Sequence, residues 1–402
     1  MEKQRKRFFV VLTVWLGVWV MVSCSRPGPA FRRADINELQ IRVLLSRSTP
    51  VTFGVSGGFD VRGTDARLIT NRSSGVRNAR ITRKPDGHWD ILGLHPTDPR
   101  IEIVPVPGEN ILWEGRPLRG RLRCLARPKG VLTINELHVD DYLMGVLNNE
   151  LYSSWCPATF RALAIAARTY ALYEKARRGK NADFDVFAGQ GSQVYRGMLS
   201  ESAKARRAVA DTAGIVLTVK YGGRDKIFPT YYSSCCGGHS RPPAEAFGRG
   251  KDLPPLAGVE DPWCRQMPKK YHWGEVRFGL KKLDKKLRDA KLLTGPNRIR
   301  RIESVKDQSK RRIKTIILID EKGKKRSIPA DVFRLAVGSG RMRSTWCDVS
   351  FEKNELVLRN GRGFGHGVGL CQCGAEIQAR RGATALQLLQ FYYPGATPVR
   401  AY

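Results

Sequence analysis

The spacing of apolar residues changes at about residue 139, and this change constrains the fold more than any other feature of the sequence. Before it, from residue 39 to about 134, apolar residues stand in short runs separated by Gly, Pro and Asn-Arg turns, which is the pattern of short β-strands. After it they recur every three or four residues, as in helices. This order predicts an α+β chain with a β-rich N-terminal part. The strands expected there cover 39–45, 51–55, 101–106, 122–125 and 131–134.

Helices are expected over 139–150 and 157–178. The second has Pro157 in its first turn and Gly179 as its stop, which are typical of helix ends. Thr384 and Gln387 have the spacing of a capping box at the start of a last helix. Between residues 179 and 384 the sequence predicts a helix over 200–211, a hairpin of strands 215–219 and 226–233 and an amphipathic segment over 281–293. A glycine-rich loop over 361–369 and a helix over 370–381 follow.

The chain is strongly basic, with 70 Lys and Arg against 37 Asp and Glu among 402 residues and a net charge of +33. Its 42% hydrophobic content is that of a folded protein, so a disordered tail does not explain the charge. Such a charge predicts a polyanionic partner, either nucleic acid, an anionic membrane face or an acidic cell-wall polymer.

The N-terminus has the features of an export signal. Basic residues precede an apolar stretch over 8–22, which is short for a membrane-spanning helix and suited to a signal peptide. A small residue and then Cys24 follow, as at a bacterial lipoprotein cleavage site. We therefore expect an exported protein of the cell envelope that is anchored to the membrane through a lipid on Cys24. The alternative is an uncleaved signal anchor, and neither favours cytoplasmic nucleic acid as the partner.

These patterns predict four parts. Residues 1–24 are the signal peptide and 25–38 a polar linker. Residues 39–119 are expected to form the β-rich N-terminal domain and 120–402 a domain of mixed helices and strands. Within the latter, 269–314 forms a basic insertion that we interpret as a docking surface.

Glu150 is the first candidate for a chemical role. It falls on the same predicted helical stripe as Leu143, Val146 and Leu147, so it is expected to face a core or a cleft. Loss of water raises the pKa of a carboxyl group toward the range of a useful general acid. The alternative is a helix-end glutamate paired with a neighbouring cation.

Arg168 is the second candidate. The residues three and four positions away on either side are Ala, Ile or Leu, so its predicted helix is apolar nearly all round. A guanidinium group in such a place must be paired or line a cleft, because an unpaired buried charge is costly. Glu150, on the preceding helix, is the expected partner.

Two further segments have the composition of a binding site. In 231–239 adjacent glycines after a strand allow a ligand to approach the backbone, and Tyr232 and Ser234 offer hydroxyl groups. In 361–369 glycine occupies every second position, and His366 is one of only two bulky rings. This loop lacks the Lys-Ser/Thr of a phosphate-binding loop. This loop either forms a surface on which a substrate binds or is a close-packed structural loop.

The C-terminal part contains residues of the types that bind zinc. They are Cys235, Cys236, His239, Cys264, Cys371 and Cys373. Their spacing is irregular and includes no C-x-x-C pair, and in an exported protein a disulfide such as Cys236 with Cys264 is an equally good account. The pattern leaves both alternatives open, and we expect neither a metal nor another cofactor.

Several motifs occur in a defined order from residue 120 to the C-terminus. They are Asp-Asp-Tyr-Leu-Met-Gly-Val-Leu-Asn-Asn-Glu at 140–150, Ala-Ile-Ala-Ala-Arg-Thr-Tyr-Ala at 164–171, Gln-Val-Tyr at 193–195, Tyr-x-Ser-x-Cys-Gly-Gly at 232–238, Asp-Pro-Trp-Cys at 261–264, Gly-Arg-Gly-Phe-Gly-His-Gly-Val-Gly-Leu-x-Gln-x-Gly-Ala at 361–375 and Phe-Tyr-Tyr-Pro-Gly at 391–395. In this order they resemble the stage II sporulation protein D family, which includes the amidase-enhancer proteins.

The resemblance implies a peptidoglycan lytic transglycosylase. Such an enzyme is a lyase that cleaves the β-1,4 bond between N-acetylmuramic acid and N-acetylglucosamine and leaves a 1,6-anhydro-muramoyl end. Glu150 matches the family glutamate that serves first as acid and then as base. A single carboxylate can suffice because the sugar's own 6-hydroxyl attacks, whereas hydrolases usually use two.

The resemblance also implies substrate-binding residues, which are Arg168, Gln193, Tyr195, Tyr232, Ser234 and His366. The expected partners are peptidoglycan glycan strands, an anionic wall or membrane surface and other cell-wall hydrolases, and no nucleic acid. Some family members hold zinc just before the Gln-x-Tyr motif, but residues 184–192 contain neither Cys nor His, so zinc is not expected there. The alternative function is a non-catalytic, wall-binding enhancer of an N-acetylmuramoyl-L-alanine amidase.

Overall fold

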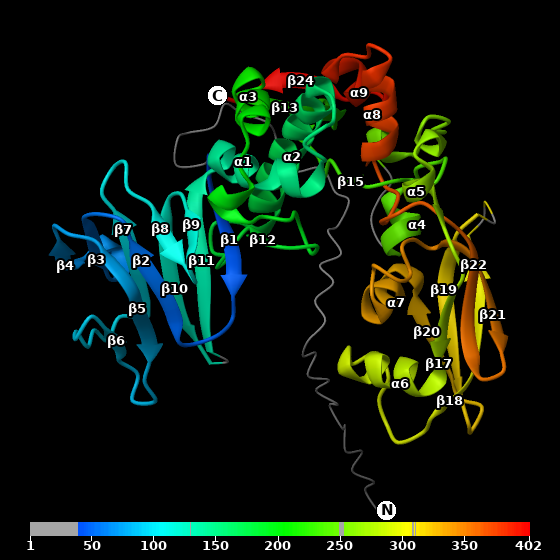
Figure 1. The fold of residues 1–402 in the computed structure, drawn as a ribbon, viewed down its shortest axis with the longest axis horizontal. Coiled ribbons are helices and arrows are strands. Elements are labelled where there is room, and N and C mark those ends of the chain that lie inside the picture. Colours follow the sequence, from blue (N-terminus) through cyan, green and yellow to red (C-terminus); the bar gives the residue numbers. More distant parts are fainter. Residues whose placement is uncertain (1–38, 129, 249–252, 308, 310) are drawn as a thin grey trace, which may run out of the picture.

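The computed structural model describes residues 39–402, apart from 129, 249–252, 308 and 310 (Figure 1). The predicted signal peptide, its Cys24 and the linker lie outside the described residues. Within the part of the chain that is described, no helix is both long and apolar enough to span a membrane.

The N-terminal part consists mostly of strands, and the chain as a whole combines helices with several sheets, so the predicted α+β class is confirmed (Figure 1). A seven-stranded sheet has the order β12-β1-β11-β10-β7-β3-β4, and a five-stranded sheet has the order β6-β5-β2-β8-β9. The strands are β1 (Gln40–Ser46), β2 (Val51–Val55), β3 (Phe59–Arg62), β4 (Leu68–Arg72), β5 (Val76–Arg83), β6 (Trp89–Ile91), β7 (Arg100–Pro105), β8 (Ile111–Trp113), β9 (Arg116–Leu118), β10 (Arg121–Arg127), β11 (Gly130–His138) and β12 (Val186–Phe187).

The two sheets share one hydrophobic core. Phe53 of β2 and Phe59 of β3 come from different sheets, and their buried rings meet edge to face at 6.3 Å. The larger sheet continues across the predicted boundary at residue 119, because β10 pairs with β7, and β11 pairs with both β10 and β1. The domain boundaries themselves stay a prediction.

The two helices that follow have the predicted bounds. Helix α1 (Val139–Glu150) begins directly after β11, and the His138 ring accepts a hydrogen bond from the Asp140 backbone at its start. Helix α2 (Pro157–Arg178) begins at its proline and ends at Gly179, which has a positive φ of 81°. The two helices contribute buried side chains to the same core as the N-terminal sheets.

Of the remaining helices, those over 203–211, 280–289, 372–380 and 385–392 agree with the sequence patterns in place and differ at their ends, whereas the short helices over 243–247, 268–271 and 330–337 were not predicted. Helix α3 begins after Ser202, whose hydroxyl caps it by accepting the Ala205 N–H, rather than at residue 200. The capping box of Thr384 and Gln387 is confirmed. These helices are α3 (Ala203–Asp211), α4 (Pro243–Phe247), α5 (Pro268–Tyr271), α6 (Leu280–Asp289), α7 (Ala330–Val337), α8 (Gln372–Arg380) and α9 (Ala385–Tyr392).

A second core lies in the part of the chain that contains the basic segment, at the right of Figure 1. It extends from Trp273 to Leu358 and so includes residues beyond the predicted insertion at 269–314. Its elements are α6, α7, β16 (His272–Trp273), β17 (Val276–Gly279), β18 (Ile299–Lys306), β19 (Ile313–Asp320), β20 (Lys325–Pro329), β21 (Trp346–Glu352) and β22 (Glu355–Arg362).

Two short strands bring distant motifs together. Strand β15 (Tyr232–Ser233) pairs in parallel with β23 (Leu370–Cys371), so the segments 231–239 and 361–375 lie side by side. Because residues 370 and 371 are used in this pairing, α8 begins two residues later than predicted. The predicted strand 226–233 is interrupted, and Pro229, which has no N–H to donate, lies in the interruption. A separate sheet is formed by β13 (Ile215–Tyr221), β14 (Arg224–Ile227) and β24 (Thr397–Arg400).

Candidate active site around Glu150

The carboxylate of Glu150 is held by two hydrogen-bond donors. Glu150 is the last residue of α1, where the helix passes into extended backbone at Leu151. The backbone N–H of Val194 donates to Oε1 at 3.0 Å, and Nε2 of Gln372 donates to Oε2 at 3.3 Å. No Lys, Arg or His of the described chain forms an ion pair with Glu150. The alternative of a glutamate paired with a cation at the helix end is therefore not what the structure contains.

Burial raises the pKa of Glu150 above that of an ordinary carboxyl group. The hydrogen bonds from Val194 and Gln372 act in the opposite direction, because they favour the ionised form, but they do not outweigh the loss of water. A carboxyl group in this setting retains its proton to higher pH than an exposed one. It is thus better suited than an exposed carboxyl group to donate that proton to a substrate.

Buried polar atoms without a hydrogen-bond partner among the described residues gather near Glu150. They are the hydroxyl groups of Tyr142 and Tyr232 and Oε1 of Gln193, although the Tyr232 hydroxyl also interacts with the Gln193 side chain. Burial and then the charge of Glu150 raise the pKa of both phenols, so both rings lie within the electrostatic reach of its carboxylate. Buried polar atoms in folded proteins nearly always have a partner. This group is therefore where the hydroxyl groups of a ligand are expected to bind.

Arg168 does not pair with Glu150, and that expectation was wrong. Its guanidinium group is fully buried and binds Oδ1 of Asp140, with Nε at 2.9 Å and Nη2 at 2.8 Å. Its remaining donors reach backbone carbonyls of residues 209, 212 and 215. The arginine thus ties α1 to α2 and the end of α3. Its predicted role in substrate binding is untested, and these contacts do not favour it.

Tyr195 is buried in the protein core behind the site. Its hydroxyl donates to Oδ1 of Asn135 at 2.7 Å, and its ring lies 5.3 Å from that of Tyr142. Gly145 of α1 faces this ring, since a Cβ there would come within 2.6 Å of it. Tyr195 therefore positions Tyr142, and through the chain it also positions the Val194 N–H.

His366 lies in the glycine-rich loop and is held in its neutral form. Its Nδ1 accepts the Val368 N–H at 3.0 Å, and burial lowers the pKa of the ring to about 4. The ring also contacts those of Tyr231 and Phe247. Ser234, which follows β15, uses its backbone carbonyl to accept the Cys373 N–H. The roles of both residues in substrate binding stay predictions.

Sequence reasoning missed three groups that the structure places at Glu150. Gln372 was part of a recognised motif, but only the parallel pairing of β15 with β23 brings it to the carboxylate. Tyr142 lies eight positions before Glu150 on α1, about two helical turns, which was a usable signal. The backbone of Val194 carried no signal, because any residue has an N–H.

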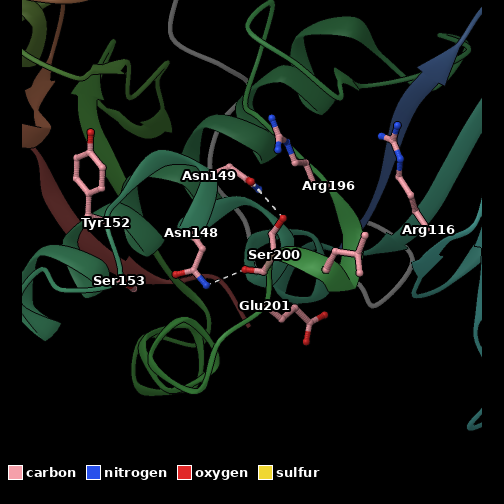
Figure 2. Close-up of a pocket in the computed structure, with 9 residues that line it drawn as sticks. Arg116, Asn148, Asn149, Tyr152, Ser153, Arg196, Ser200 and Glu201 are labelled. Carbon is pink, nitrogen blue, oxygen red and sulfur yellow. Dashed lines mark hydrogen bonds between the residues drawn. The ribbon is translucent and has the colours of Figure 1, made fainter.

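A pocket of about 840 Å³ opens beside the end of α1 (Figure 2). Asn148, Asn149 and Ser200 point toward one another at its centre, with Tyr152 at one end and Arg116 at the other. The side chain of Asn148 donates to the Ser200 carbonyl, and the Ser200 hydroxyl donates to Asn149. Glu150 does not line this pocket, although Asn149 just before it and Tyr152 two residues after it do.

Metal-ligating side chains are absent from the immediate contacts of Glu150 described above. In the described parts of the chain, the one group of such side chains close enough to share an ion is Cys236, Asp261, Cys264 and Cys371. It lies at the loops next to β15 and β23.

Comparison with known proteins agrees with the resemblance read from the motifs. A family model described as stage II sporulation protein matches residues 127–219. An uncharacterized protein of Brachyspira hyodysenteriae is 30% identical over 305 residues, which cover 74% of this chain and 78% of that protein. Stage II sporulation protein D of Bacillus subtilis is 25% identical over 278 residues, or 65% of this chain and 75% of the relative. The amidase enhancer of the same organism is 27% identical over 295 residues, or 63% of this chain and 40% of the relative.

The chain belongs to the stage II sporulation protein D family. Membership of this family, together with the similarity to an amidase enhancer, supports a cell-wall-related role. The chain spans less than half the length of that amidase enhancer, so the enhancer's activity does not transfer to it directly.

Proposed function

We propose that the chain is a lytic transglycosylase that cleaves the β-1,4 bond between N-acetylmuramic acid and N-acetylglucosamine in glycan strands, with Glu150 as acid and base. One observation carries the proposal: Glu150 is a half-buried residue whose carboxyl group is held by two hydrogen-bond donors and lies near buried polar atoms of Tyr142 and Gln193. Burial dominates its raised pKa, and no second carboxylate is among the causes. An isolated carboxyl group suits the anhydro-forming reaction better than hydrolysis, which usually uses two.

The reaction involves two proton transfers, one from Glu150 and one to it. Protonated Glu150 donates its proton to the glycosidic oxygen, and the bond between that oxygen and C1 of the muramoyl residue breaks. The resulting carboxylate then accepts the proton of the 6-hydroxyl as O6 bonds to C1. Glu150 ends in its starting state, and no water is consumed. Val194 and Gln372 hold the carboxyl group in one orientation throughout and stabilise its ionised form.

We further infer that the pocket beside α1 receives part of the glycan. Its lining combines an exposed aromatic ring, Tyr152, with amide and hydroxyl groups that match the hydrogen-bonding groups of a sugar. The arginines at 116 and 196 add positive charge, which favours the carboxylate of a muramoyl side chain.

The experiment is a digest of purified glycan strands, followed by mass spectrometry of the products. The proposal expects 1,6-anhydro ends with the unmodified chain and loss of at least two orders of magnitude of activity in Glu150→Gln. Glu321→Gln, which changes an exposed glutamate, is the matched control and is expected to retain full activity.

A second candidate function is favoured by the similarity to an amidase enhancer. In that case the chain binds the wall and stimulates an amidase without cleaving glycan itself. Glu150→Gln would then retain both wall binding and stimulation, and the unmodified chain alone would release no products.

A further inference from the structure

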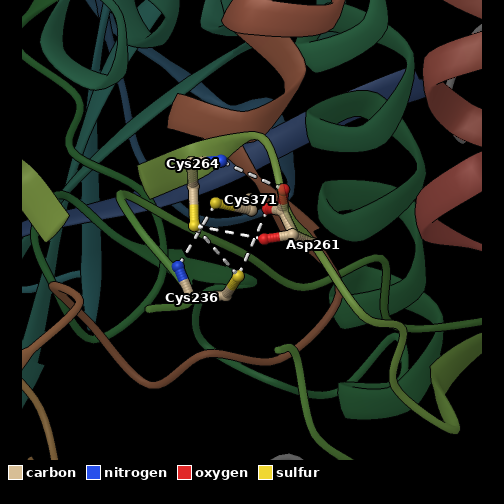
Figure 3. A group of neighbouring side chains, drawn as sticks. All are labelled: Cys236, Asp261, Cys264 and Cys371. Atoms are coloured by element: carbon tan, nitrogen blue, oxygen red, sulfur yellow. Dashed lines mark hydrogen bonds between the residues drawn. The ribbon is translucent and has the colours of Figure 1, made fainter. Parts of the chain in front are cut away.

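Three thiols and one carboxylate converge from three separate segments of the chain (Figure 3). Cys236 follows β15, Cys264 begins the short 3-10 turn Cys264–Gln266, Asp261 lies three residues before that turn, and Cys371 ends β23. All four are buried. Their ligand atoms lie within 4.8 Å of one another, and Figure 3 shows the side chains pointing toward a common centre.

The distances match the edges of a tetrahedral metal site. With Zn–S bonds of about 2.3 Å, two sulfur ligands of a tetrahedral zinc ion stand roughly 3.8 Å apart. The Sγ atoms of Cys236 and Cys264 are 3.7 Å apart, and Sγ of Cys236 is 3.2 Å from Oδ2 of Asp261. A disulfide needs about 2.05 Å between its sulfur atoms. One disulfide would also leave the third thiol and the carboxylate buried together.

The surrounding donors stabilise the ionised forms that a metal requires. Sγ of Cys371 accepts the backbone N–H of Cys236 at 3.2 Å and of Gly374, in the first turn of α8, at 3.4 Å. A thiolate at a helix N-terminus is further favoured by the helix dipole. Oδ1 of Asp261 accepts two backbone N–H groups, and the Tyr392 hydroxyl donates to Oδ2. Such partners orient the ligands of metal sites.

Close packing preserves this arrangement. A Cβ at Gly374 would come within 2.2 Å of both Oδ2 of Asp261 and the Tyr392 hydroxyl, so only glycine leaves room for the carboxylate. Arg312, also buried, donates to the Cys236 carbonyl. Its positive charge partly offsets the charge of −2 that three thiolates and one carboxylate give around a divalent ion.

We propose that Cys236, Asp261, Cys264 and Cys371 bind one zinc ion. The proposal departs from the sequence-based expectation of no metal, because the irregular spacing concealed ligands that meet only through the β15 and β23 pairing. Zinc would fix Cys371 next to Gln372, which contacts Glu150, and would fix the loop after Tyr232. The ion is thus a structural support for the candidate active site and takes no part in the reaction.

Zinc content and thiol state test the proposal independently of glycan cleavage. The full chain, purified without chelators, is expected to contain about one zinc per chain by elemental analysis. Replacing the ion with Co²⁺ should give a thiolate-to-cobalt charge-transfer band in the near ultraviolet. Cys264→Ser is expected to lose at least tenfold in bound zinc, whereas Cys347→Ser, a buried thiol of the second core, should retain it.

The cobalt spectrum of the unmodified chain keeps the test valid if Cys264→Ser does not fold. Alkylation of the denatured chain, followed by mass spectrometry, counts the free thiols. Absence of zinc with all thiols reactive would overturn the proposal. So would absence of zinc with a Cys236–Cys264 disulfide, or an unchanged zinc content in Cys264→Ser.

Discussion

The protonation of Glu150 sets the chemistry that this residue can perform. Its pKa is raised by burial, so the folded protein holds the proton at pH values where the unfolded chain has already released it. Over that interval the unfolded state binds fewer protons, and the free energy of unfolding falls as the pH rises. Below the ordinary carboxyl pKa both states are protonated, and above the folded pKa both are ionised, so the contribution is constant at either side.

Glu150→Gln should therefore stabilise the protein at pH 8 and have little effect on stability at pH 4. Glutamine keeps the shape of the carboxylic acid and removes the cost of ionising it. Thermal unfolding of both proteins at pH 4, 6 and 8 measures the effect. A difference in melting temperature that is the same at pH 4 and pH 8 would contradict the assignment of a raised pKa.

Replacing Arg168 tests whether this residue supports the fold, as its buried contacts indicate. Arg168→Met removes the partner of Asp140 and leaves carbonyl groups near residue 212 without their donor, so it should lower the free energy of unfolding by about 3–5 kcal/mol. Urea denaturation measures this loss. Lys84→Met, which removes a half-exposed ion pair with Asp90, should have little effect. An equally small effect of both changes would exclude the buried pair as a support of the helices.

At the scale of elements, helix α1 carries a glycine where a helix normally prefers alanine. Gly145→Ala should destabilise the protein by about 1–3 kcal/mol, because its Cβ would lie 2.6 Å from the Tyr195 ring. In an uncrowded helix the same change would stabilise by up to about 1 kcal/mol. Gly274→Ala, where nothing lies within 4 Å of the added Cβ, is the control. A stabilised Gly145→Ala protein would show that α1 and Tyr195 are loosely packed.

Helices can be predicted from the sequence where their bounds depend on residues close together in the chain. The bounds of α1 and α2 and the capping box at Thr384 follow from periodicity and end residues, and all were confirmed. The partner of Arg168 and the contact between Gln372 and Glu150 could not be found in this way. Each contact joins residues far apart in sequence. The partner of Arg168 depends on how the helices pack, and the contact of Gln372 with Glu150 depends on the two-residue pairing of β15 with β23. Glu150 was singled out because it shares a helical stripe with Leu143, Val146 and Leu147, and the structure buries these three residues.

For the whole molecule, the positive charge is expected to control attachment to the wall. Helix α6 buries Leu283 and Leu287 and exposes four lysines, which are Lys281, Lys282, Lys285 and Lys286. These belong to the segment that the sequence predicts as a docking surface. Attraction between exposed charges weakens with salt, since the screening length falls from about 10 Å at 0.1 M to about 3 Å at 1 M.

Binding to purified wall fragments should therefore decrease at least several-fold between 0.1 M and 1 M salt. Replacing the four lysines of α6 with glutamate should weaken binding at 0.1 M and flatten its dependence on salt, with no loss of activity on short soluble glycans. Co-sedimentation with wall fragments measures the bound fraction. A variant that binds like the unmodified chain at every salt concentration would exclude α6 as the docking surface.

The measurement that tests the central claim most directly is the mass of the glycan fragments that the purified chain releases. We predict fragments that end in 1,6-anhydro-muramic acid, each lighter by one water than the corresponding hydrolysis product, and at least two orders of magnitude less product from Glu150→Gln. Fragments with a free reducing end, or full activity in Glu150→Gln, would contradict it.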